Sequence, residues 1–118
     1  MGDTITINAK GDVAFAKDQA IANISKQISD SANLADDLAD KLNKLTQAVN
    51  AMARDMPDDK ANEVTGDLQT LVDEAEKDEP RKKWYQLSGE GLIEAAQAVG
   101  SLGKPVIDAT NAVLKLLG

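Results

Sequence analysis

The sequence predicts a mainly α-helical long-helix bundle with an N-terminal β-hairpin, and three features support this prediction. The chain has 118 residues, a length that suits one domain. It contains one Trp, one Tyr and one Phe, so the core must consist mostly of aliphatic side chains, which suits packed helices. Apolar residues recur every seven positions between residues 21 and 56, as in a long helix. We therefore expect a β-ribbon in residues 1–16 and about three helices in residues 17–118, in a single domain overall.

The N-terminal segment has the alternation of a two-stranded hairpin. Large apolar side chains occupy every second position over residues 4–8 and 12–16, and Gly11 between them can supply the positive φ of a tight turn. Its apolar face comprises Ile5, Ile7, Val13 and Phe15. Because a two-stranded ribbon is marginal in water, we expect these side chains to pack against the helices or against another subunit.

The seven-residue repeat predicts a first helix of about 37 residues, roughly 55 Å long, with a heptad seam. One heptad position holds Ile21, Ile28, Ala35, Leu42, Val49 and Met56, and the other holds Ile24, Ser31, Leu38, Leu45 and Met52. Flanking positions are also apolar, namely Ala32, Leu34, Ala39, Ala48 and Ala53. Because this stripe is wider than the seam of a two-stranded coiled coil, we expect the helix to contact at least two partners.

Prolines and a glycine mark the later helices. Pro57 suits the first turn of a second helix, which we expect to run to about Asp78. Pro80 precedes a third helical stripe that Gly103 ends, and Pro105 then begins a last segment.

The difference in length between the first two helices predicts self-association. A second helix of about 22 residues covers roughly 33 Å and leaves part of the first helix exposed. Exposed isoleucines cost about 1.5–3 kcal/mol each relative to burial, so another element or subunit should cover them. We therefore expect a homo-oligomer. The expected interaction residues are Ile5, Ile7, Val13, Phe15, Ile21, Ile24, Ile28, Leu34 and Trp84.

The residue types present argue against catalysis. The chain has no Cys and no His, which removes thiolate nucleophiles and imidazole bases. Asp36, Asp37 and Asp40 have the spacing of a Mg²⁺-binding DDxxD cluster, but we interpret them as a solvated helix face. We expect no enzyme activity, no catalytic residue, no cofactor and no metal.

The charge is acidic and unevenly distributed. The net charge of -7 opposes binding to nucleic acid. Segment 29–79 carries 14 acids and 5 bases, whereas segment 80–118 carries 3 acids and 5 bases. An inhibitor that docks a basic partner on the acidic segment is therefore one alternative function. The three bases at Arg81–Lys83 are expected to pair with the acidic run at residues 76–79.

The apolar segments are short for a membrane protein. No stretch of about 18 apolar residues occurs, and the N-terminus lacks the order of a signal peptide, so we expect a cytoplasmic protein. Small residues do recur in the C-terminal part, at Gly89, Gly91, Ala95, Ala96, Gly100 and Gly103. They favour close helix packing, and a membrane-associated helical protein that uses residues 84–117 is the other alternative.

Several sequence motifs resemble those of small bacterial accessory modules associated with the effectors of conflict and signalling systems, which have a Gly-Asp-rich β-ribbon followed by helices. The resemblance rests on Gly2-Asp3-Thr4-Ile5-Thr6-Ile7, Gly11-Asp12-Val13, the run from Lys83-Trp84-Tyr85 to Leu92, Pro105-Val106-Ile107 and Leu114-Lys115-Leu116-Leu117. Such modules accompany larger NTPase, protease-like or TIR-type chains. The resemblance implies association instead of chemistry, and a larger effector protein as a possible partner. We therefore expect a non-enzymatic, self-associating assembly or adaptor module of a bacterial signalling or defence system.

Overall fold

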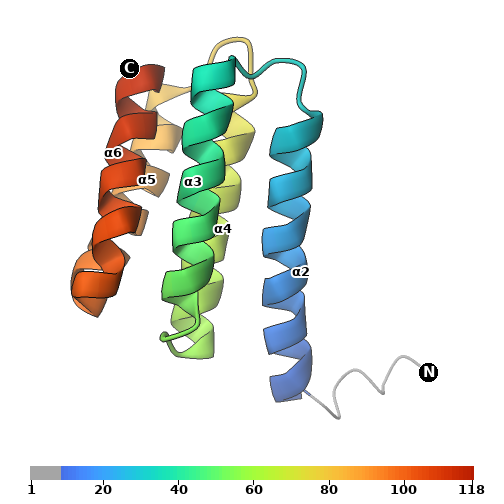
Figure 1. The fold of residues 1–118 in the computed structure, drawn as a ribbon, viewed down its shortest axis with the longest axis vertical. Helices are drawn as coiled ribbons and strands as arrows, with labels where there is room; N and C mark the ends of the chain where they lie inside the picture. The colour runs from blue at the N-terminus through green and yellow to red at the C-terminus, as the bar shows by residue number, and fades with distance from the viewer. Residues whose placement is uncertain (1–8) are drawn as a thin grey trace.

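The computed structural model describes residues 9–118, with side chains from Gln19 onward, and this part of the chain is mainly helical (Figure 1). The helices are α2 (Ala9–Asp30), α3 (Asp36–Ala53), α4 (Asp58–Ala75), α5 (Lys82–Val99) and α6 (Lys104–Leu117), with a 3₁₀ turn, η1 (Ser101–Gly103), before the last. Successive helices run in opposite directions (Figure 1). Helices α3 to α6 form a ring in which each packs against the next and α6 closes onto α3, while α2 packs against both α3 and α4.

The prediction of one long helix over residues 21–56 is wrong, because a turn divides it into α2 and α3. In this turn the backbone N–H of Asn33 donates to Ser31 Oγ at 3.3 Å, and its side-chain amide donates to the Glu76 carbonyl at 3.2 Å. Asp36 and Asp37 then occupy the first turn of α3, where the helix dipole favours negative charge. The described residues therefore hold five α-helices instead of about three.

The heptad positions on both sides of this turn fill the core. The isoleucines of α2 are buried together with the seam residues of α3, in one cluster that also includes α4, α5 and α6. Ile24 is 0% exposed, and Ile21, the most exposed of the three isoleucines, is 7% exposed. The expected exposed isoleucine stripe is therefore absent, because α2 folds back onto its own chain. The difference in length between the first two expected helices therefore no longer supports a homo-oligomer.

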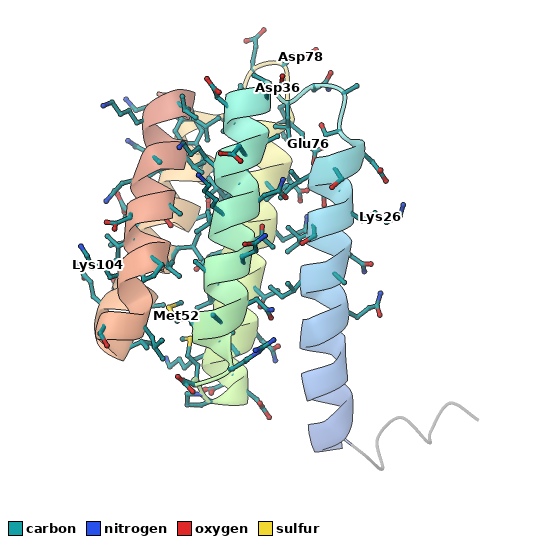
Figure 2. The ribbon with its side chains drawn as sticks, in the orientation of Figure 1. Lys26, Asp36, Met52, Glu76, Asp78 and Lys104 are labelled. Atoms are coloured by element: carbon teal, nitrogen blue, oxygen red, sulfur yellow. The ribbon has the colours of Figure 1, made fainter. Side chains whose placement is uncertain are left out.

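A polar contact fixes α2 against α4. The Gln27 side-chain amide donates to Asp73 Oδ1 at 2.8 Å and to the Glu76 carboxylate, while its carbonyl oxygen accepts from Gln69 Nε2 at 2.8 Å. Gln27 directly precedes the buried Ile28, and its partner Glu76 is labelled toward the end of the bundle that carries Asp36 and Asp78 in Figure 2. The alignment of α2 along α4 thus rests on both apolar burial and hydrogen bonds.

The helix boundaries near the prolines follow the prediction, but α5 ends at Val99 instead of at Gly103, which lies in η1. Pro57 directly precedes α4, which ends at Ala75, three residues before the expected end. Gly100 has a φ of 93°, a conformation that favours glycine, and ends α5. Pro105 lies in the first turn of α6, as expected. The radius of gyration of 14.4 Å is that of a compact domain of this length.

The predicted hairpin lies largely outside the described residues. Its first strand, with Ile5 and Ile7, lies outside the described residues. The backbone of residues 12–16 belongs to α2. The side chains of Val13 and Phe15 also lie outside the described part of the chain.

Candidate interaction surface

The residues predicted to mediate interaction differ widely in exposure. Ile21, Ile24 and Ile28 are in the core, and Leu34 is partly buried against it. Trp84 is 43% exposed and is therefore available on the surface. Of the predicted interaction residues whose side chains are described, Trp84 is the most exposed.

Trp84 lies in a basic and apolar environment at the start of α5. The Arg81 guanidinium carbon lies 5.8 Å and Lys83 Nζ 5.6 Å from the centre of its ring, both within the range of a cation–π interaction. Leu87, one turn further along the helix, is 52% exposed. The surface at this end of α5 thus combines an exposed aromatic ring, an exposed leucine and cationic groups.

Glu74 fixes the position of this surface. Arg81 does not pair with the acidic run 76–79 as expected, but with the buried Glu74 carboxylate, at 2.6 Å between Nη2 and Oε2. Lys77 Nζ lies 3.3 Å from the same oxygen. The first residue before α5 is therefore tied to the last turn of α4, which sets the direction in which α5 leaves the turn.

A groove of about 640 Å³ lies between α4 and α5 toward the other end of the bundle. This is the end at which Figure 2 shows Met52 and Lys104, opposite the end with Asp36 and Asp78. The apolar lining comprises Met56, Pro57, Val64, Gly91, Ala95, Ala98, Val99 and Leu102. The charged lining comprises Asp55, Lys60, Glu63, Asp67 and Glu94. The groove is apolar within and carries four carboxylates against one ammonium group.

Asp67 is the most perturbed of these carboxylates. Partial burial and, second, the nearby charge of Glu63 raise the pKa of Asp67 to about 6. Its carboxylate lies against Gly91 of α5, where a Cβ atom would overlap Oδ2. The absence of a side chain at residue 91 therefore makes room for the carboxylate between the two helices.

The acidic cluster in α3 is solvated. Asp36, Asp37 and Asp40 are all exposed, and Asp40 Oδ2 lies 3.4 Å from Lys44 Nζ. Within residues 9–118, no group of three or more His, Cys, Asp or Glu residues is close enough to hold a metal ion. The spacing of this cluster therefore reflects a surface face of the helix.

Sequence reasoning missed the groove residues. Glu63 and Asp67 share a face of one helix because they are four residues apart, a signal that was present in the sequence. Glu94 joins them only because α5 packs against α4. That pairing of helices could not be deduced from periodicity alone.

Comparison with known proteins gives no family for this fold and surface. Among the helices described, none is long and apolar enough to cross a membrane. No protein-family model, curated protein or solved structure matches the chain.

Proposed function

We propose that this chain is a non-catalytic assembly or adaptor module that binds a cationic amphipathic helix of a protein partner along the α4/α5 face. We define this face by the groove between α4 and α5, together with Trp84 and Leu87. The observation that carries the proposal is the combination of an apolar groove, four bordering carboxylates and exposed apolar side chains in line with it.

The chemistry of the face specifies the kind of partner. Apolar side chains of a partner helix at i, i+3, i+4 and i+7 would bury the groove lining, as in helix-in-groove recognition. Lysine or arginine side chains on the flanks of that helix would meet Glu63, Asp67 and Glu94. The opposite charges of the groove and the partner helix speed their association, and the groove carboxylates disfavour binding of acidic helices.

The experiment compares two designed helical peptides of equal length, one built from Leu and Lys and the other from Leu and Glu. Trp84 is the single tryptophan, so its fluorescence reports binding next to Leu87, and calorimetry gives the affinity. We expect micromolar binding of the Leu/Lys peptide and at least tenfold weaker binding of the Leu/Glu peptide.

Charge-reversal variants distinguish binding of the peptide at the groove from a general attraction to the acidic protein. The double substitution E63K/E94K should weaken binding of the Leu/Lys peptide at least tenfold, because Glu63 and Glu94 both border the groove. D37K/D40K changes the net charge equally on an exposed face of α3 and should have a much smaller effect. Equal weakening by both variants, or no binding, would contradict the proposal.

A further inference from the structure

Asp67 and Gly91 meet at the middle of the α4/α5 face. Asp67 lies midway along α4, and Gly91 lies midway along α5. The Asp67 carboxylate occupies the space that a side chain at residue 91 would fill. Trp84 precedes Gly91 by seven residues, which places it about 10 Å along α5 and on the same side of the helix. A partner helix that covers both Trp84 and the groove must therefore pass over Asp67.

Asp67 differs from the other carboxylates of the groove in its burial and in its lack of a cation. Its side chain is partly buried, whereas Asp55, Glu63 and Glu94 are exposed. Lys60 also lines the groove, but it pairs with Glu63, at 3.9 Å between Nζ and Oε2. Among the residues whose side chains are described, none forms an ion pair with Asp67. The middle of the face therefore holds a partly buried carboxylate whose charge is not neutralised.

A partner helix on this face would remove the remaining water from the Asp67 carboxylate. A charge that is fully buried without a partner is strongly unfavourable. A lysine or arginine side chain of the partner helix would offset this cost, whereas an apolar or acidic side chain would not. The exposed carboxylates of the groove stay solvated and discriminate less, because solvent screens their charge. The side chain that the partner places opposite Asp67 thus decides which helices bind.

We propose that Asp67 is the specificity-determining residue of the α4/α5 face and binds one lysine or arginine side chain of the partner helix in exchange for a proton. This inference rests on the proposed function, because it assigns one contact within that interface. The pKa of about 6 means that a fraction of Asp67 is protonated in the free chain at slightly acidic pH. When the cation binds, the O–H bond breaks, the proton passes to the buffer and the carboxylate pairs with the cation. The charged groups that face Asp67 are Lys60 and Glu63 on α4, Glu94 on α5 and Asp55 in the turn before α4.

The test measures binding of the Leu/Lys peptide to the full chain at pH 5 and at pH 7.5. The bound cation lowers the pKa of Asp67, so the peptide binds the deprotonated form more tightly. We therefore expect the affinity to rise about tenfold from pH 5 to pH 7.5. Calorimetry at pH 6, in two buffers that differ in ionisation enthalpy, should show the release of about half a proton per bound peptide.

Two variants, each with a matched control, test the residue and its position. Asp67→Asn should bind the peptide about tenfold more weakly at pH 7.5 and equally well at both pH values. Asp37→Asn removes the same charge from an exposed site on α3 and should keep the pH dependence. Gly91→Ala would push the Asp67 carboxylate toward solvent, which should lower its pKa and shift the pH dependence to lower pH. Gly66→Ala, where nothing lies within 4 Å of the added carbon, should cause no shift.

The outcomes separate this inference from the proposed function. Replacing the lysines of the peptide by glutamine one at a time should remove the pH dependence at one position, the one opposite Asp67. Equal effects at every position would overturn the inference. A peptide that binds equally well at both pH values, and binds Asp67→Asn as tightly as wild type, would also overturn it and leave the proposed function standing. A peptide that binds at neither pH would overturn both.

Discussion

Arg81 covers the carboxylate of Glu74, which is 2% exposed, and so joins the last turn of α4 to the start of α5. Glu74 Oε1 accepts hydrogen bonds from the Arg81 backbone N–H at 3.0 Å and from its Nε at 3.2 Å. These contacts, the Arg81 side chain above all, lower the pKa of Glu74 to about 2, because they favour the charged carboxylate against the cost of burial. This ion pair thereby connects the end of α4 to the helix that carries Trp84.

Arg81→Met is expected to raise the pKa of Glu74. In wild type this carboxylate stabilises the fold above the ordinary pKa of 4.5, and that stabilisation is lost as the pH falls toward about 2. The variant removes the side-chain hydrogen bonds of Arg81 but leaves the backbone N–H bond and the burial of Glu74. It should therefore destabilise the fold at neutral pH and lose less stability than wild type as the pH falls. Carboxyl-carbon NMR titration measures the pKa directly. Lys82→Met, at an exposed neighbour, is the control, and a Glu74 pKa near 4.5 in wild type would contradict the account.

Asp67→Asn is expected to stabilise the protein above pH 6. The raised pKa means that the folded state binds a proton more tightly than the unfolded state does. The stability contribution of Asp67 is therefore full below pH 3.8 and is lost as the pH rises toward about 6. The Asp67→Asn variant cannot lose this contribution. Its free energy of unfolding at neutral pH should therefore exceed that of wild type by on the order of 1 kcal/mol, after allowance for solvent screening.

Urea unfolding at pH 4 and pH 7 measures this effect. The advantage of Asp67→Asn over wild type should be larger at pH 7. Glu63→Gln should lower the pKa of Asp67, because it removes a neighbouring negative charge. An Asn variant that is no more stable at pH 7 than at pH 4, relative to wild type, would argue against desolvation of Asp67.

The sequence predicted which residues are buried better than it predicted how the helices are connected. The heptad positions of residues 21–28 and 42–52 are in the core, as the pattern requires. The break between them was missed because the apolar period continues across a turn whose two flanking helices face the same core. Local signals for the break existed in Ser31, Asn33 and the paired Asp36 and Asp37. They contribute little per residue, and tertiary packing decides whether such a site becomes a turn.

The part of the candidate surface around Trp84 could be predicted from the sequence, but the groove could not. Trp84 directly follows the three bases Arg81–Lys83, and this combination of bases and an aromatic residue is visible in the sequence. The carboxylate groove depends on α4 and α5 meeting side by side, with Gly91 opposite Asp67. Such a juxtaposition follows from the packing of two helices and has no periodic signature in either one.

Gly103→Ala is expected to destabilise the protein by about 1–3 kcal/mol, as overpacking does. A Cβ atom on Gly103 would overlap the carbonyl group of Ala96, and backbone cannot move aside as cheaply as a side chain. Gly66→Ala is the matched control, since nothing lies within 4 Å of the added carbon there. Gly66→Ala should raise the free energy of unfolding by roughly 0.5–1 kcal/mol, because alanine favours a helix more than glycine does. Thermal unfolding of both variants checks the difference, and equal effects would contradict it.

Thr110→Val is expected to stabilise the protein by about 1 kcal/mol. The hydroxyl of Thr110 is buried and has no hydrogen-bond partner within the described residues. Valine has nearly the same shape and carries no polar group to desolvate. Thr65→Val should have the opposite sign, because the Thr65 hydroxyl donates to the Ala61 carbonyl at 2.8 Å. Chemical denaturation decides the matter, and a destabilised Thr110→Val would show that the hydroxyl has a partner in solution.

Ile24→Ala is expected to lower the free energy of unfolding by about 2–5 kcal/mol, because it leaves a cavity in a core position. Ile24 is 0% exposed within a single chain, so this loss should be the same at all protein concentrations. Asn23→Ala, at the exposed neighbouring residue, should change stability by less than about 0.5 kcal/mol. If Ile24 instead stabilised a contact between subunits, the unfolding midpoint of wild type would rise with concentration and the variant would lose that dependence. Urea titrations at two concentrations a hundredfold apart therefore test whether the N-terminal isoleucines stabilise the monomer, as their burial against α3 and α4 requires.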